Sequence, residues 1–200
     1  MPNSTFAQIS LPLDIPDVDV FATTHTKDGK YIIAVQSRSN QTTCSHCDQR
    51  IECNYGHNRK IRLRHLSMLG FETYIDLKPK RGQCRQCENH PTTTQLLDWY
   101  EPRSPHTKAF DHYLMKQLVG STVSDVSLKE KVTYEAVLGA IKRQLPTEIN
   151  WNGIENLGTI GIDEVAAKKG HGHYRAIISA RQPDGNVMIL AVLENRKKSG

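Results

Sequence analysis

The side chains best suited to chemistry in this sequence are two pairs of cysteines, Cys44 with Cys47 and Cys84 with Cys87. Two residues separate the members of each pair, a spacing at which both sulfurs can turn toward one ion. Four thiolates form the closed tetrahedral shell typical of structural Zn²⁺. We therefore predict one structural Zn(2+) bound by these four residues. A redox-active or incidental pair of thiols is the alternative.

The fifth cysteine, Cys53, has no partner at this spacing. We expect it to be a bystander, although it could replace one of the four ligands. Several histidines lie close enough in sequence to do the same, although each is individually a weaker candidate: His46, His57, His65 and His90.

The chain has no long apolar run and no charged-then-apolar segment at its N-terminus. These absences argue against a transmembrane helix and against a secretory signal, so we expect no membrane partner. The expected location is the cytoplasm. Paired cysteines in that reducing compartment are more often metal ligands than disulfides.

Positive charge is concentrated between the two cysteine pairs. Residues 54–90 contain 8 Lys and Arg against 3 Asp and Glu, whereas residues 1–53 contain 4 against 6. A clustered positive field attracts polyanions through phosphate contacts and counterion release. A solvated surface is the plainer explanation, but the neighbouring metal site favours nucleic acid. The expected contacts here are Arg59, Lys60, Arg62, Arg64, Lys80 and Arg81.

The cysteine module also contains two runs that alternate polar and apolar residues, 60–66 and 72–78, separated by Leu69 and Gly70. Alternation with period two indicates β-strands. We expect these runs to form a two-stranded ribbon that leads into the second cysteine pair, as in a zinc ribbon. An earlier run, 31–35, follows a turn signal and is expected to be a separate strand.

Residues 105–146 have the pattern of three helices. Gly120 should end the first, a short helix should cover 122–129, and Thr133 should cap a third that ends at Pro146. A short helix, a turn and a longer helix have the spacing of a helix-turn-helix. A plain three-helix bundle would have the same pattern. The expected DNA contacts on the third helix are Thr133, Tyr134, Lys142 and Arg143.

The last segment has the pattern of an antiparallel meander of three strands, at 159–167, 174–181 and 187–193. The third strand is almost continuously apolar, which predicts burial on both faces and helices that cover the sheet. No helical pattern follows it. We therefore expect the chain to be a fragment of a longer protein.

Asp163 lies in the middle of the first of these strands, among apolar residues. A carboxylate in a buried strand needs a partner or a metal, so Asp163 is a candidate functional residue. The alternative is an exposed edge, with Asp163 or Glu164 paired to Lys168 or Lys169. His171 and His173 could bind metal, but a solvated turn is the simpler interpretation.

The order of these features resembles the ISL-type family of bacterial insertion-sequence transposases, and the run from Gly161 to His171 is its most specific part. The resemblance covers about residues 11–194 and implies the N-terminal half of such a protein. It implies an RNase H-like domain with an Asp-Asp-Glu triad, in which Asp163 would be the first, catalytic Asp and a ligand of Mg(2+). The other two carboxylates would follow Gly200, so this chain alone is expected to be inactive.

The resemblance also implies partners. The zinc module and helix-turn-helix would bind double-stranded DNA at terminal inverted repeats, the protein would be associated with the nucleoid, and a homodimer is one possible assembly. The alternative functions are a zinc-ribbon and helix-turn-helix regulator without catalytic activity, and an RNA-binding protein. The RNA-binding alternative is disfavoured because the ribbon lacks interleaved aromatic residues.

The predicted fold class is therefore α+β: a small zinc-ribbon-like β module, a helix-turn-helix segment of three helices, and the opening antiparallel β-meander of an RNase H-like domain. The predicted segments are 1–43 (N-terminal strand), 44–90 (four-cysteine module), 91–104 (connector), 105–146 (helix-turn-helix) and 158–200 (start of the catalytic domain).

Overall fold

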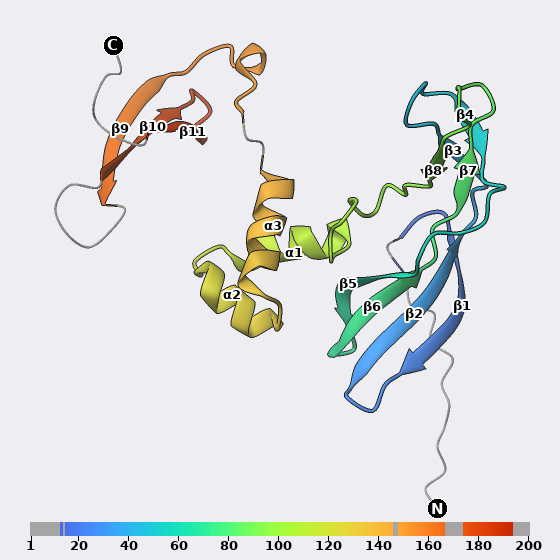
Figure 1. The fold of residues 1–200 in the computed structure, drawn as a ribbon. Helices are drawn as coiled ribbons and strands as arrows, with labels where there is room; N and C mark the ends of the chain where they lie inside the picture. Colours follow the sequence, from blue (N-terminus) through green and yellow to red (C-terminus); the bar gives the residue numbers. More distant parts are fainter. Residues whose placement is uncertain (1–12, 14, 146–147, 167–173, 194–200) are drawn as a thin grey trace, which may run out of the picture. The chain divides into compact units, whose positions relative to one another are not determined.

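The computed structural model describes residues 13, 15–145, 148–166 and 174–193. The chain divides into two units, Met1–Leu145 and Pro146–Gly200, and each is described by itself. The described residues contain eleven strands and three α-helices, so the fold is α+β as predicted (Figure 1). None of the helices in these residues is long and apolar enough to cross a membrane.

A four-stranded sheet forms the centre of the first unit, in the order β1-β2-β6-β5. Parallel pairing of β2 with β6 joins the antiparallel hairpins β1–β2 and β5–β6 edge to edge (Figure 1). The strands are β1 (Val18–His25), β2 (Lys30–Ser37), β5 (Ile61–Met68) and β6 (Phe71–Leu77).

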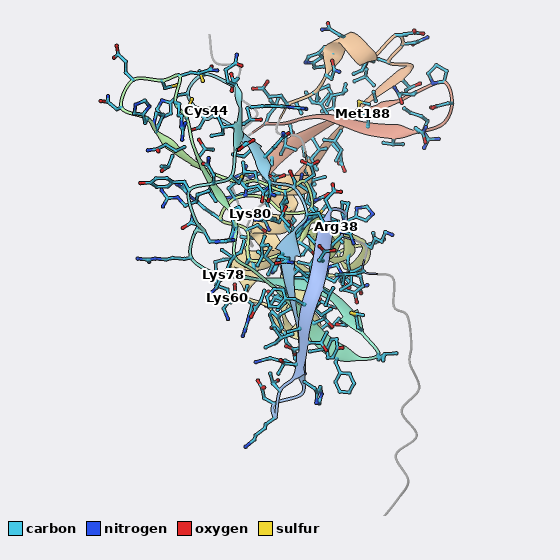
Figure 2. The ribbon with its side chains drawn as sticks, turned by 90° about the vertical axis from the view of Figure 1, so that its right-hand side faces the viewer. Arg38, Cys44, Lys60, Lys78, Lys80 and Met188 are labelled. Atoms are coloured by element: carbon cyan, nitrogen blue, oxygen red, sulfur yellow. The ribbon has the colours of Figure 1, made fainter. Side chains whose placement is uncertain are left out.

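The two faces of this sheet differ in chemistry. One face is buried beneath Ile15, Trp99 and Tyr100, and its own side chains are Ile33, Val35, Leu63, Ile75 and Leu77. The alternate residues of the same strands face the other way, because successive side chains of a strand point to opposite faces. These residues include Ala34 and Asp76. Two lysines from the ends of β5 and β6, Lys60 and Lys78, lie next to each other on this open side (Figure 2).

The predicted ribbon exists as the hairpin β5–β6, but it is not part of a separate zinc module. It pairs with β2, so residues of the predicted N-terminal segment and of the predicted cysteine module share one sheet. The physical reason is burial: Ile75 and Leu77 pair with Ile33 and Val35, so the four side chains form one apolar face that is buried together.

The cysteines lie on two much smaller hairpins. One consists of β3 (Gln41–Thr43) and β4 (Arg50–Glu52), and the other of β7 (Arg81–Gln83) and β8 (Thr92–Thr94). The two hairpins approach so closely that a Cβ atom on Gly82 would lie 2.6 Å from the carbonyl oxygen of Glu52. Only glycine fits at this position without displacing the neighbouring strand.

Three helices follow, near the predicted positions: α1 (Lys108–Gln117), α2 (Val123–Glu130) and α3 (Tyr134–Gln144). Thr107, Thr122 and Thr133 cap their N-termini, each accepting a hydrogen bond from a backbone amide in the first turn. The helices enclose a small apolar core, made of Phe110, Leu114, Val126, Val137 and Ala140.

Arg64 joins the helices to the sheet. Its backbone amide donates to the carbonyl of Pro105, and its carbonyl accepts from the amide of Thr107, so the segment before α1 lies along the edge of β5. The guanidinium of Arg64 lies 5.2 Å from the ring centres of both Tyr74 and Phe110. A cation between two aromatic rings stabilises the contact between sheet and helix.

A buried ionic network fixes α3 against α1. The carboxylate of Asp111, 1% exposed, accepts two hydrogen bonds from Arg143, at 2.6 and 2.8 Å. His106 forms a third hydrogen bond with it, at 2.8 Å. Burial acts to raise the pKa of Asp111, but the bonds from Arg143 and His106 outweigh burial and hold the pKa below its usual value.

The second unit contains a short 3₁₀ turn, η1 (Trp151–Gly153), and the predicted antiparallel meander. Its strands are β9 (Thr159–Ala166), β10 (Tyr174–Arg181) and β11 (Val187–Leu193), in the order β11-β10-β9. The predicted burial on both faces is wrong for the described residues, since Val187, Ile189 and Val192 of β11 are more than half exposed.

Replacing Asp111 by Asn should lower the free energy of unfolding by about 2–3 kcal/mol at pH 7, because the buried hydrogen bonds to the charged guanidinium of Arg143, itself 22% exposed, would be weakened. The pKa of Asp111 is depressed in the folded state, so its contribution is present above pH 3.8 and is lost as pH falls below that value. The difference between wild type and variant should shrink accordingly in urea titrations at decreasing pH.

Asp98→Asn is the matched control, because Asp98 is exposed. Its stability should stay within about 0.5 kcal/mol of wild type. Equal stability of Asp111→Asn and wild type at pH 7 would contradict the role given to the network.

Candidate metal centre and charged surface

Each cysteine pair lies in the turn of one small hairpin. Cys44 follows β3 and Cys47 precedes β4, while Cys84 follows β7 and Cys87 precedes β8. The backbone of each turn is closed by hydrogen bonds: the amide of Cys44 donates to Gln49, and the amide of Cys84 donates to Pro91. The turns therefore present the sulfurs with little freedom.

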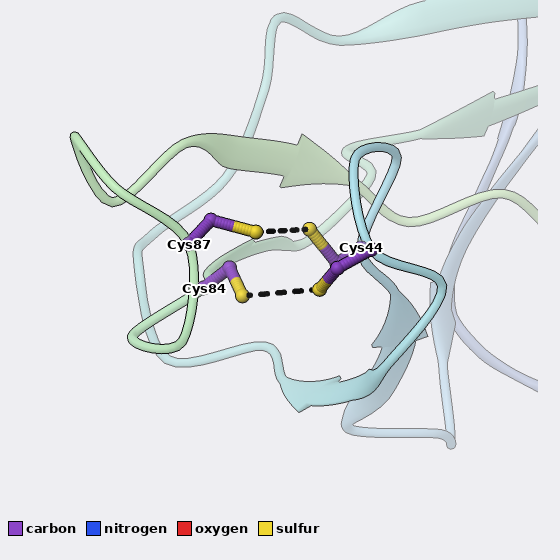
Figure 3. Close-up of side chains that lie close together, drawn as sticks. Cys44, Cys84 and Cys87 are labelled. Carbon is purple, nitrogen blue, oxygen red and sulfur yellow. Dashed lines mark hydrogen bonds between the residues drawn. The ribbon is translucent and has the colours of Figure 1, made fainter.

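The sulfurs of the two turns converge. Cys44 Sγ lies 3.9 Å from Cys87 Sγ, and Cys47 Sγ lies 3.7 Å from Cys84 Sγ (Figure 3). All four ligand atoms lie within 4.8 Å of one another. Tetrahedral zinc with bonds of about 2.3 Å requires sulfurs about 3.8 Å apart. The cluster could therefore hold a metal such as zinc, and its all-sulfur donor set matches that ion.

The thiols differ in acidity because of their surroundings. The pKa of Cys44 is lowered to about 6, chiefly because the backbone amide of His46 donates to its sulfur and then because Cys47 does the same. The pKa of Cys87 is raised to about 12, first by its hydrogen bond with Cys47 and then by burial. Crowded thiolates repel one another, and a bound dication would remove that cost.

Cys53 does not belong to this cluster. It lies beyond β4, and burial raises the pKa of its thiol. Its expected role as a bystander agrees with this position. The nearby histidines are also outside the cluster; His90, for example, forms a hydrogen bond with the carbonyl of Cys84.

The predicted DNA contacts of the basic segment fall into two groups. Arg64 is 5% exposed and lies between aromatic rings, so a DNA contact at this residue is wrong for this fold. Arg62 donates two hydrogen bonds to Asp76, and Lys60 donates a third. The carboxylate of Asp76 therefore neutralises part of the positive charge of Lys60 and Arg62. Both side chains nevertheless remain about half exposed.

The remaining basic residues of this segment are held in different ways. The ammonium group of Lys80 donates hydrogen bonds to the side chain of Asn40 and to the carbonyl of Ser39. Arg81 donates to Thr92, and its guanidinium lies 5.6 Å from the ring centre of Tyr55. Arg59 is exposed.

On α3 the structure separates the predicted contacts in the same way. Thr133, Tyr134 and Lys142 are exposed. Arg143 donates two hydrogen bonds to Asp111 and keeps 22% of its side chain exposed, so it has a structural role here, and its contact with DNA stays a prediction. Its sequence position near the end of the helix gave no sign of a partner 32 residues earlier.

Asp163 lies in β9 as predicted, but not in a buried strand. Every residue of β9 is exposed in the described part of the second unit, and β9 is an edge strand there. Asp163 Oδ1 accepts a hydrogen bond from the backbone amide of Glu164, at 2.8 Å. Burial therefore does not require a partner or a metal at Asp163. Lys168, Lys169, His171 and His173 lie outside the described residues.

Phe21, an exposed aromatic residue beside the basic open face of the sheet, could not be recognised from the sequence. Phe21 precedes the basic segment by more than 30 residues, and only the pairing of β2 with β6 brings the two together.

The described residues form an α+β protein in which four converging cysteines could hold a metal ion. Comparisons of the chain with protein-family models, with curated proteins and with solved structures find no match.

Replacing Cys84 by Ser should reduce bound zinc from about one ion per chain to almost none, because a three-sulfur shell leaves the ion open to exchange. Elemental analysis of the purified, dialysed protein measures this. Wild-type zinc content should also fall as pH is lowered, since protons compete for the thiolates.

Cys53→Ser provides the control within the same module and should retain the wild-type zinc content. A wild-type protein that purifies without zinc and fails to take it up when zinc is supplied would refute the metal centre.

Proposed function

We propose that this protein binds double-stranded DNA through its helices, that zinc holds its small hairpins, and that it is the DNA-binding part of an insertion-sequence transposase. The observation that carries the proposal is the exposed first turn of α3, which follows α2 after only three residues: Lys131, Val132 and Thr133. A connection of this length is typical of a helix-turn-helix, in which α3 would be the recognition helix.

The turn between the helices is built for this spacing. Lys131 adopts the left-handed conformation, with φ 54° and ψ 42°, and ends α2. Val132 packs on the helical core, and its carbonyl accepts a hydrogen bond from Ser127 Oγ at 2.7 Å. The following helix therefore leaves the turn in a fixed direction.

The outer surface of α3 is free to meet a groove. Val137 and Ala140 face the core, whereas Tyr134 is 45% exposed and Lys142 is exposed. The N-terminus of a helix carries partial positive charge, which favours nearby phosphates. Tyr134 and Thr133 would lie nearest base edges or phosphates, and Lys142 would contact the backbone.

The transposase assignment rests on the sequence resemblance around Asp163. In that reading Asp163 is one of three carboxylates that hold Mg(2+) for phosphodiester cleavage and transfer. Asp163 is the only one of the three in this chain that the resemblance identifies, so residues 1–200 should bind DNA without cleaving it. The expected target is the terminal inverted repeats of an insertion sequence.

The alternative is a DNA-binding regulator without catalytic activity. One observation favours it: within the described residues, the four-cysteine cluster is the only close group of three or more possible metal ligands. A nuclease assay with Mg(2+) on the longest natural reading frame separates the two functions. Cleavage that is lost in Asp163→Ala supports the transposase, and cleavage that survives this substitution rejects the role of Asp163.

Lys142→Ala should weaken binding to duplex DNA and lower the slope of log affinity against log salt by about 1, because one phosphate contact is lost. The change should be similar for different sequences. Fluorescence anisotropy with a labelled duplex between about 50 and 200 mM salt measures both quantities.

Lys27→Ala removes an exposed lysine from the β1–β2 turn, away from the helices, and should leave the slope unchanged. The helical mode of binding is refuted if Lys142→Ala and Lys27→Ala behave alike, or if the wild-type affinity does not depend on salt.

A further inference from the structure

We propose that the open face of the four-stranded sheet binds an unpaired nucleotide of a DNA strand, with its base stacked on Phe21. The proposal rests on the proposed DNA-binding function and adds a second, single-strand site to it. Its basis is a cavity of about 470 Å³ in which one exposed aromatic ring, several basic side chains and hydrogen-bonding groups come together.

The floor and walls of this cavity come from separate parts of the chain. Ala34 and Gln36 belong to β2, Asp76 and Lys78 to β6 and the residue after it, and Phe21 to β1. Val35 and Leu77 also line it, but both are 1% exposed and belong to the core of the opposite face. Ala34 lines the cavity with a small side chain, which leaves room above the sheet.

A β-bulge places Phe21. Val20 is opposite Val35 and Ala22 is opposite Ala34, so Phe21 is the additional residue with no partner in the register. Bulges redirect a side chain and often occur beside functional sites. Phe21 is 65% exposed, and it lines the same cavity as Ala34 instead of packing into the core.

The charge around the cavity suits a phosphate. Lys60 and Lys78 line it together with His57. The one carboxylate, Asp76, is already bonded by Arg62 and Lys60, and these hydrogen bonds hold its pKa below the usual value, first through Arg62. Lys60, Lys78 and Arg62 together outnumber this carboxylate and leave an excess of positive charge beside the ring.

This combination fits a nucleotide better than phosphate alone or duplex DNA. Phosphate alone would gain nothing from an aromatic ring, and a base within a duplex is already stacked on its neighbours. An unpaired base offers a free π-face to Phe21 while its phosphate meets the lysines, which is the usual arrangement for single-stranded DNA on proteins. The exposed amide of Gln36 would bond the edge of the base.

The test uses the zinc-loaded 200-residue chain and two labelled probes, a single-stranded dT12 oligonucleotide and a duplex, in fluorescence anisotropy. Phe21→Ala should weaken dT12 binding about tenfold, in line with the loss of one stacked base. Phe21→Tyr should restore binding to within about twofold, since its ring still stacks. Duplex binding should be unchanged in both variants.

Phe71→Ala is the matched control, because Phe71 is an exposed aromatic residue of the same sheet, 41% exposed, that does not line the cavity. It should leave dT12 binding unchanged. Photo-cross-linking with 5-iodo-deoxyuridine in the oligonucleotide gives an independent readout, and the cross-linked peptide should contain Phe21.

The outcomes separate this inference from the proposed function. If duplex binding is intact but Phe21→Ala binds dT12 as wild type does, the nucleotide site is refuted and the helical DNA site stands. If the wild type binds neither probe, both proposals fail. Binding of rU12 at least about tenfold tighter than dT12 would overturn the assignment to DNA.

Discussion

The carboxylate of Asp111 connects the three parts on which the arrangement of the first unit depends. It lies on α1, accepts two hydrogen bonds from Arg143 on α3, and bonds His106 in the segment that runs along β5. Breaking such a buried pair leaves an uncompensated charge, so the three parts hold one arrangement rather than several. The direction in which α3 presents its exposed face therefore depends on a residue that is itself buried.

The cysteine hairpins obey a different constraint. Their strands have three residues each and bury little apolar surface, so packing alone gives them little stability. Hydrogen bonds tie them to their surroundings at a few points; buried Gln95, for example, donates to the carbonyls of Ser39 and Gln41. A metal bound by all four sulfurs would link the two hairpins, whose cysteines are up to 43 residues apart. The long spacer between the pairs is explained by the sheet, because β5 and β6 lie within it and belong to another core.

Much of this could be predicted from the sequence wherever the signal is local. The spacing of the cysteines predicted the cluster, and Thr133 and Gly120 predicted where helices begin and end, because capping chemistry acts within one turn. Non-local pairing could not be predicted in this way. Nothing near Arg64 or Arg143 indicates that their partners are Phe110 and Asp111, so both were taken for surface cations. The ribbon was assigned to the zinc module for the same reason: alternation predicts a strand but not the neighbour with which it pairs.

The same difference between local and non-local signals explains why an aromatic and basic surface was overlooked. The basic segment was taken to lack interleaved aromatic residues for stacking with unpaired bases, although it contains Tyr55, Phe71 and Tyr74. The sheet supplies the ring from another strand, since β1 and β6 lie on either side of β2, and Phe21, at the bulge, lines the same cavity as Lys60 and Lys78. A nucleic-acid surface assembled across strands need not be visible in any one of them. The absence of aromatic residues within a basic run is therefore weak evidence against stacking when a sheet can bring a distant strand beside it.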